Sequence, residues 1–278
     1  MTGWIGFHDT GRAVLRMTGG DARAVLQDVV TNDVAGIDAG PVYAALLTPQ
    51  GKYLFDFMLL AEGADILIDV AAERAAALAQ RLKMYALRRD AQVAEAAELS
   101  VSLLWPLGDA AAPEIHSARA APEIQGARAA PDPRAAGLGL RIYAPEVPEV
   151  VRGGDRAGYD ARRVALAVPE SGVELVPEDS YILEAGFERL NGVDFRKGCY
   201  VGQEVTARMK HKTELRKGLV QVQVEGAAPP GTPLETPEGR PAGRLFTQAD
   251  GRGLAHLRLD RAAEELTAGA ARVRYPAG

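Results

Sequence analysis

The spacing of apolar residues changes along the chain, and this change limits the folds that the chain can adopt. The first hundred residues alternate between strand patterns of period two and helical patterns, whereas beyond Lys217 only short strand patterns occur, separated by glycine and proline. We therefore expect an α+β N-terminal part followed by a small C-terminal β-barrel. Because the chain has 278 residues, more than one hydrophobic core usually organises, it should fold into two or three packed units.

Local patterns place the N-terminal elements. Apolar and polar residues alternate through Arg12–Thr18, which predicts a strand, and Asp21 stands where a carboxylate meets the free N–H groups at the start of a helix. Pro49 and Gly51 favour a hairpin turn. Further strands are predicted at 43–47, 53–60 and 66–70, and a helix with an apolar face at Leu78, Leu82 and Tyr85.

A tandem repeat interrupts the middle of the chain. The segment 112–120 recurs at 121–129 and, in degenerate form, at 130–135, with much alanine and proline and few large apolar residues. Prolines obstruct a continuous helix, and so little apolar surface cannot offset the entropy lost on ordering. We expect residues 110–136 to form a mobile insertion without a site; docking of a partner protein is the alternative.

Beyond the repeat, strands are predicted at 138–143, 163–168, 220–224, 243–248, 253–259 and 272–275, and a helix at 181–190.

Composition and charge argue against several functions. No stretch approaches the roughly 20 apolar residues that span a bilayer, so no membrane partner is expected. The net charge of −5 argues against nucleic-acid binding, which depends on clustered cations. The N-terminus has no basic segment followed by an apolar run, which predicts a cytoplasmic location. The basic segment 208–217 is either a solvated connector or the lining of an anion channel.

The chain contains a single cysteine, Cys199. One thiol cannot form an internal disulfide or complete a zinc or iron–sulfur site, so no stably bound metal is expected. Gly198 and Gly202 flank the cysteine and permit tight backbone geometry. The nearby cation Lys197 would stabilise a thiolate, which makes Cys199 a candidate reactive residue; a buried structural thiol is the alternative.

Polar residues suggest a ligand site in two further places. Gln203 and Glu204 stand at the expected start of a helix, and Arg208 falls in its last turn, an order that suits the helix dipole. Asp56 shares a predicted strand face with apolar residues, where an unpaired carboxylate would be costly. It should therefore meet a ligand amine, a basic side chain or backbone N–H groups, unless it faces solvent on an edge strand.

The octapeptide Lys-Gly-Cys-Tyr-Val-Gly-Gln-Glu at 197–204 resembles the signature of the YgfZ family, which are folate-binding relatives of the glycine-cleavage aminomethyltransferase and include a mitochondrial iron–sulfur assembly factor. Segments 15–34 and 47–57 resemble other parts of that family, and 239–259 is similar more loosely. The resemblance implies an aminomethyltransferase-like ring of ferredoxin-like α+β units, with tetrahydrofolate in a central cavity and a small C-terminal β-barrel.

The resemblance also implies domain boundaries and residue roles. Residues 1–100 would form a folate-binding α+β domain, 101–212 a second α+β domain with the signature, and 213–278 the barrel. Lys197 and Cys199 would be the chemically active residues, and the folate contacts would be Asp56, Gln203, Glu204 and Arg208. For Glu204, capping of its own helix is the alternative.

Three functions are compatible with these features. The first is a tetrahydrofolate-binding accessory protein that assists the assembly or repair of iron–sulfur clusters, with client enzymes or assembly proteins as partners and no conventional turnover. The second is a folate-dependent aminomethyltransferase or demethylase, in which Asp56 would orient the amine or stabilise positive charge as the carbon unit migrates. However, the chain lacks the Gly-Tyr-Thr-Gly-Glu segment of the aminomethyltransferases. The third is a scaffold that binds proteins and does not need Cys199.

Overall fold

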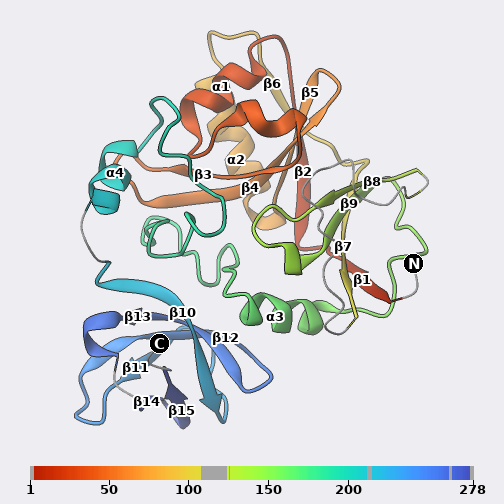
Figure 1. Ribbon diagram of the computed structural model, residues 1–278. Coiled ribbons are helices and arrows are strands. Elements are labelled where there is room, and N and C mark those ends of the chain that lie inside the picture. Colours follow the sequence, from red (N-terminus) through yellow and green to blue (C-terminus); the bar gives the residue numbers. More distant parts are fainter. Residues whose placement is uncertain (1–2, 108–123, 125, 212–214, 263–264, 276–278) are drawn as a thin grey trace.

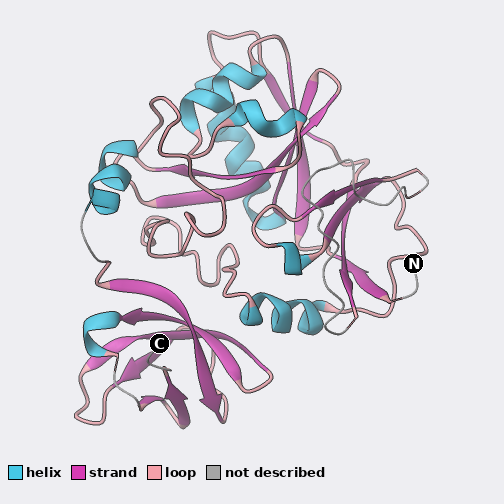
Figure 2. Cartoon of the chain, in the orientation of Figure 1, coloured by secondary structure: helices cyan, strands magenta, loops and turns pink. Residues whose placement is uncertain are grey.

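The computed structural model describes residues 3–107, 124, 126–211, 215–262 and 265–275. They form two antiparallel sheets and a closed barrel, connected by a long segment without regular structure (Figures 1 and 2). None of the helices in these ranges has the length and apolar character needed to cross a bilayer.

The first sheet has five antiparallel strands in the order β3-β4-β5-β2-β6. Its strands are β2 (Arg12–Thr18), β3 (Val42–Leu47), β4 (Tyr53–Glu62), β5 (Asp65–Ala71) and β6 (Gln92–Glu95), and the helices α1 (Ala22–Val29) and α2 (Ala72–Tyr85) cover one face. The strand and helix predictions for this region are confirmed. Asp21 differs from its prediction, because its carboxylate makes no capping bond to α1 and instead accepts a hydrogen bond from the backbone N–H of Asp90 at 2.9 Å.

Strand β4 is buried on both faces because a separate hydrophobic core packs against each face. Phe57 and Leu59 pack against the helices, whereas Met58 and Leu60 pack into the centre of the molecule. Since side chains alternate across a strand, Asp56 also points to the centre.

The second sheet has four strands in the order β1-β7-β9-β8. They are β1 (Trp4–His8), β7 (Ser100–Pro106), β9 (Leu140–Ala144) and β8 (Arg128–Pro131). The first strand of the chain therefore pairs with β7 rather than joining the sheet that follows it in sequence. Much of the tandem repeat, residues 108–123 and 125, lies outside the described residues. Its last part does not match the expected mobile insertion, since β8 pairs with β9 and Asp132 and Arg134 are buried.

The segment between the second sheet and the barrel corrects two predictions. Residues 163–168 were expected to be a strand, but helix α3 (Arg156–Ala165) covers their first part and Asp155 caps its N-terminus through the N–H of Gly158 at 2.8 Å. Residues 181–190 form consecutive turns rather than a helix. Gly186 has a φ of +81°, which interrupts helical geometry in spite of the favourable apolar spacing.

After helix α4 (Gln203–His211), six strands close into a barrel in the order β10-β13-β12-β11-β14-β15. They are β10 (Lys217–Glu225), β11 (Thr232–Glu235), β12 (Pro241–Ala249), β13 (Arg252–Arg258), β14 (Leu266–Ala268) and β15 (Ala271–Arg274). The predicted C-terminal barrel is thus confirmed. In Figure 1 the barrel lies below the first sheet, and the segment between α3 and α4 runs between them.

Candidate functional site

Cys199 lies on the loop that precedes α4, and its side chain is exposed to solvent. The alternative of a buried structural thiol is therefore excluded. An exposed thiol on an ordered loop can reach a partner protein without any opening of the structure. No group of three or more His, Cys, Asp or Glu side chains that could hold a metal ion occurs within the described residues.

Lys197 is buried and anchors this loop. Its ammonium group donates hydrogen bonds to the carbonyl oxygens of Gln27 at 2.7 Å and Asn32 at 3.1 Å, and a third to the carbonyl of Val30. These carbonyls lie at or just after the C-terminus of α1, where backbone acceptors have no helical partner. Burial lowers the pKa of Lys197 to about 8. All three N–H bonds of the ammonium are engaged by carbonyls, so the group fixes the loop and does not bond to the thiol.

Two glycines allow the same loop to pack closely on the turn between β3 and β4. Gly202 has a φ of +83°, and a Cβ atom there would lie 2.6 Å from the carbonyl oxygen of Thr48. Gly51 faces it, and a Cβ atom on Gly51 would lie 2.8 Å from the Cβ atom of Val205. The tight backbone geometry expected at Gly202 is thus observed, and the group packed against it is the main chain of a turn.

The predicted ligand residues of α4 lie at the molecular surface. Gln203 is half-buried at the first position of the helix, and its backbone N–H donates to the carbonyl of Tyr200 at 3.3 Å. Glu204 and Arg208 are exposed, and neither side chain makes a hydrogen bond or ion pair with another described residue. The capping role considered for Glu204 therefore has no bond to support it among these residues.

Asp56 lies inside the molecule and accepts two hydrogen bonds from tyrosines. Tyr43 donates to Oδ2 at 3.0 Å and Tyr53 to Oδ1 at 2.7 Å, while the Oγ atom of Ser171 lies 2.7 Å from the Tyr53 hydroxyl. Burial, reinforced by the Asp56 carboxylate, raises the pKa of both tyrosines well above the ordinary value, so they remain donors. Because Asp56 is only 2% exposed on a central strand, the solvent-facing alternative is wrong. The expected partner exists, but it is a pair of hydroxyl groups.

Sequence reasoning missed a chain of buried charges between the two sheets. Asp69 accepts from Nε of Arg12 and from Nη1 of Arg141, both at 2.7 Å, and Arg141 continues to Asp132 at 2.9 Å. Arg134 then bonds Asp132 at 2.8 Å. Burial disfavours the charged carboxylate of Asp69, but the guanidinium groups of Arg12 and Arg141 hold its pKa below the ordinary value. The signal in the sequence is faint: it consists of Arg12, Asp69 and Arg141 within mostly apolar strands.

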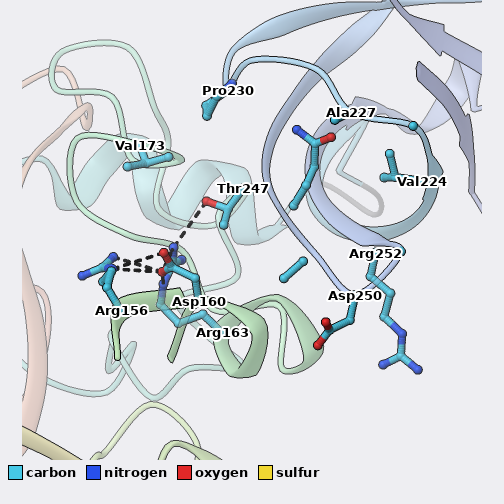
Figure 3. A pocket seen from close by; sticks show the side chains of 14 residues that line it. Arg156, Asp160, Arg163, Val173, Val224, Ala227, Pro230, Thr247, Asp250 and Arg252 are labelled. Atoms are coloured by element: carbon cyan, nitrogen blue, oxygen red, sulfur yellow. Dashed lines mark hydrogen bonds and ion pairs between the residues drawn. The ribbon is translucent and has the colours of Figure 1, made fainter. Parts of the chain in front are cut away.

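Two cavities border the barrel. One, of about 590 Å³, lies between α3 and the barrel, where Asp160, Arg156, Arg163 and Thr247 form a connected set of ion pairs and hydrogen bonds (Figure 3). The other, of about 330 Å³, lies between the β3–β4 turn, residues 174–184 and strands β12 and β13.

A third cavity, of about 550 Å³, lies beside α1. Four residues are predicted to contact folate: Asp56, Gln203, Glu204 and Arg208. None of them lines any of these three cavities. Asp56 is buried under tyrosines, while Glu204 and Arg208 face solvent on α4. None of these three cavities brings the four residues together, and folate binding by them stays a prediction.

Comparison with known proteins identifies relatives along most of the chain. The mitochondrial iron–sulfur cluster assembly factors IBA57 of Homo sapiens and Mus musculus are each 33% identical to it; the human alignment covers 91% of this chain and 77% of that protein, and the mouse alignment 92% and 78%. An IBA57 homolog from Neurospora crassa is also 33% identical, over 79% of this chain, which spans only 54% of that relative. The family model of the CAF17 C-terminal β-barrel domain matches residues 216–276.

The fold resembles that of the glycine cleavage system aminomethyltransferase T from Bartonella henselae. The TM-score is 0.76, the sequence identity is 16%, and the match covers 98% of this chain and 84% of that structure. The predicted aminomethyltransferase-like fold with a C-terminal barrel is thereby confirmed. The predicted cytoplasmic location is corrected, because the relatives named above are designated mitochondrial. The narrower assignment to the YgfZ branch stays a prediction.

Proposed function

The chain belongs to the IBA57 family of iron–sulfur cluster assembly factors, and from this premise we propose that it assists the assembly or repair of iron–sulfur clusters in client enzymes. Cys199 would act as a transient ligand or exchanging thiol. Its partners would be iron–sulfur enzymes or assembly proteins.

The observation that supports this proposal most directly is the exposure of the single cysteine on an anchored loop. Iron–sulfur clusters are usually held by four protein ligands, mostly cysteines, and this chain has one. Any cluster that Cys199 touches would therefore draw its other ligands from a second molecule. Lys197 would contribute by holding the thiol at the surface rather than by moving a proton.

Replacement of Cys199 tests this function. Cys199→Ser should lower the rate of cluster assembly on an apo client enzyme at least tenfold, measured as recovery of client activity with purified assembly proteins. Because the side chain is exposed, the free energy of unfolding should change by no more than about 0.5 kcal/mol. Arg252→Gln, on the exposed surface of the barrel, serves as the control and should assemble clusters at the normal rate. Full activity of Cys199→Ser would instead favour a scaffold that needs no thiol.

Tetrahydrofolate binding is a separate part of the proposal, supported by the resemblance of the 197–204 segment to folate-binding proteins. A ligand present at 100 times its dissociation constant should stabilise the folded protein by about 2.7 kcal/mol, which a thermal shift detects. If Asp56 contributes, Asp56→Asn should reduce the shift relative to its own ligand-free baseline. The absence of any shift with the unmodified protein would remove folate from the proposed function.

Loss of cellular complementation by Asp56→Ala but not by Cys199→Ser would favour one-carbon chemistry.

A further inference from the structure

The cavity of about 330 Å³ lies where three distant parts of the chain meet. Lys52 comes from the β3–β4 turn, Tyr181 from the segment that connects α3 to α4, and Arg244 from barrel strand β12. We propose that this cavity binds a small dianion, either a phosphate ester or a short dicarboxylate. This inference goes beyond the proposed function and depends on neither Cys199 nor folate.

Three cations line the cavity without a carboxylate partner among the described residues. The ammonium group of Lys52 donates to the backbone carbonyl of Asp179 at 2.6 Å and lies 3.7 Å from the centre of the Tyr181 ring. These contacts fix its position and leave its positive charge uncompensated. Lys217 and Arg244 line the same cavity, and neither side chain makes a hydrogen bond or ion pair within the ranges that the structure describes.

Most of the other charges that line the cavity are already paired. Glu174 accepts from the Thr247 hydroxyl at 2.6 Å and forms an ion pair with Arg163 at 3.4 Å, outside the cavity lining. Glu184 bonds His256 at 3.1 Å, a contact that compensates the carboxylate charge only when the imidazole is protonated, and Arg258 bonds Asp260 at 3.1 Å. The side chain of Asp179 is the one lining carboxylate without a partner among the described residues. With the imidazole neutral, three unpaired cations against the carboxylates of Asp179 and Glu184 leave an excess of about one positive charge.

This charge and size determine the class of ligand. A concave site with an excess of one sign of charge concentrates ions of the opposite sign. Arg244 can bond two oxygens of one phosphate or carboxylate group, and lysines add point charges. A volume of about 330 Å³ is near the lower limit for ligand pockets, which favours a small molecule.

The location of the cavity connects it to the cysteine loop. Lys52 directly follows Gly51, and Gly51 packs against Gly202 and Val205 at the start of α4. A dianion bound to Lys52 would therefore contact the turn that supports the loop carrying Cys199.

Titration of the full-length protein with inorganic phosphate and with malonate tests the proposal. At constant ionic strength set with chloride, at least one of the two anions should raise the melting temperature in a saturable way, because it binds only the folded state. A response to phosphate alone supports a phosphate ester as the ligand class, and a response to malonate alone supports a dicarboxylate. The absence of a saturable shift with both anions would overturn the proposal.

Substitutions that each remove one positive charge test whether the anion binds in this cavity. Lys217→Gln and Arg244→Gln should each weaken the binding at least tenfold, as expected when a charged hydrogen bond is lost. Both side chains are exposed, so the variants should fold. Arg272→Gln removes an exposed arginine of barrel strand β15 that does not line the cavity, and it should bind like the unmodified protein. An equal loss in all three variants would show that the anion responds only to overall charge, and would refute the site. None of these outcomes bears on the assembly assay with Cys199→Ser.

Discussion

Single buried charges hold together segments that are far apart in the sequence. Lys197 bonds the carbonyl of Gln27, 170 residues earlier, and Asp69 bonds Arg141, 72 residues later. A buried charge is tolerated when ion pairs and hydrogen bonds compensate for the lost hydration. The cysteine loop and the two sheets thus owe their relative positions to a few specific polar contacts as well as to apolar packing.

Asp69 offers the clearest test at this scale. Asp69→Asn leaves Arg12 and Arg141 without their shared carboxylate charge, and removal of one partner of a buried ion pair costs about 3–5 kcal/mol. Urea unfolding at pH 7 should show this loss. Asp65→Asn, at the half-exposed start of the same strand, should cost less than about 1 kcal/mol. Equal effects of the two substitutions would contradict a central role for the buried pair.

The lowered pKa of Asp69 also predicts how the free energy of unfolding depends on pH. This pKa is lower in the folded protein than in the unfolded chain, where the pKa of an aspartate is about 4. The stabilisation that Asp69 contributes is therefore complete above about pH 4 and is lost as the pH falls through the lower folded-state value. In urea unfolding across pH 2–7, Asp69→Asn should show a smaller decrease at low pH than the unmodified protein. Parallel curves would indicate that other carboxylates account for the acid sensitivity.

Among the secondary-structure elements, helix α4 depends for its position and stability on its contact with the β3–β4 turn. Gly202→Ala would place a methyl group 2.6 Å from the Thr48 carbonyl oxygen at a φ of +83°, so both the contact and the backbone would be strained. We expect a loss of about 2–4 kcal/mol in urea unfolding, together with faster amide hydrogen exchange in α4.

Gly239→Ala provides the matched control for Gly202→Ala. Its φ is +75°, close to that of Gly202, but no atom lies within 4 Å of the added methyl group. It should therefore cost only about 1 kcal/mol, from backbone strain alone. If the two variants were equally stable, the packing of the turn against α4 would contribute nothing measurable.

At the scale of the whole molecule, the barrel is joined to the rest of the chain by polar contacts. Thr247 on β12 donates to Glu174 at 2.6 Å, and the backbone N–H of Leu219 donates to the carbonyl of Glu184 at 2.7 Å. Helix α3 lies against β12 and contributes the carbonyl of Val164, which accepts from Gln221 at 2.8 Å. Such an interface can weaken without unfolding either side.

Thr247→Val tests this connection. The substitution leaves the buried Glu174 carboxylate without its hydroxyl donor, which should cost about 1–3 kcal/mol. Differential scanning calorimetry should show a lower melting temperature and a transition for the barrel that separates from that of the sheets. Thr267→Val, on the exposed side of β14, should leave the thermogram unchanged. A single, unshifted transition for Thr247→Val would mean that apolar packing alone holds the barrel in place.

Much of the architecture was accessible from local sequence patterns. The strands around the 48–52 turn, both helices of the first unit and the C-terminal barrel follow from apolar periodicity and turn residues, because these patterns record which side of an element faces a core. They failed at Gly186, where one left-handed residue breaks a helical spacing, and at β8, where an alanine- and proline-rich repeat joins a sheet edge. The family signature located the cysteine loop, and the single cysteine limited what that loop could bind by itself.

The sequence by itself determined the fold class, the barrel and the presence of one thiol beside two glycines and a lysine. Only the tertiary structure decided what each polar group meets: tyrosines for Asp56, three carbonyls for Lys197, and two arginines for Asp69. The physical reason is the range of the interactions. Periodicity is a property of neighbouring residues, whereas the partner of a buried charge is chosen by packing between segments that the chain brings together from a distance.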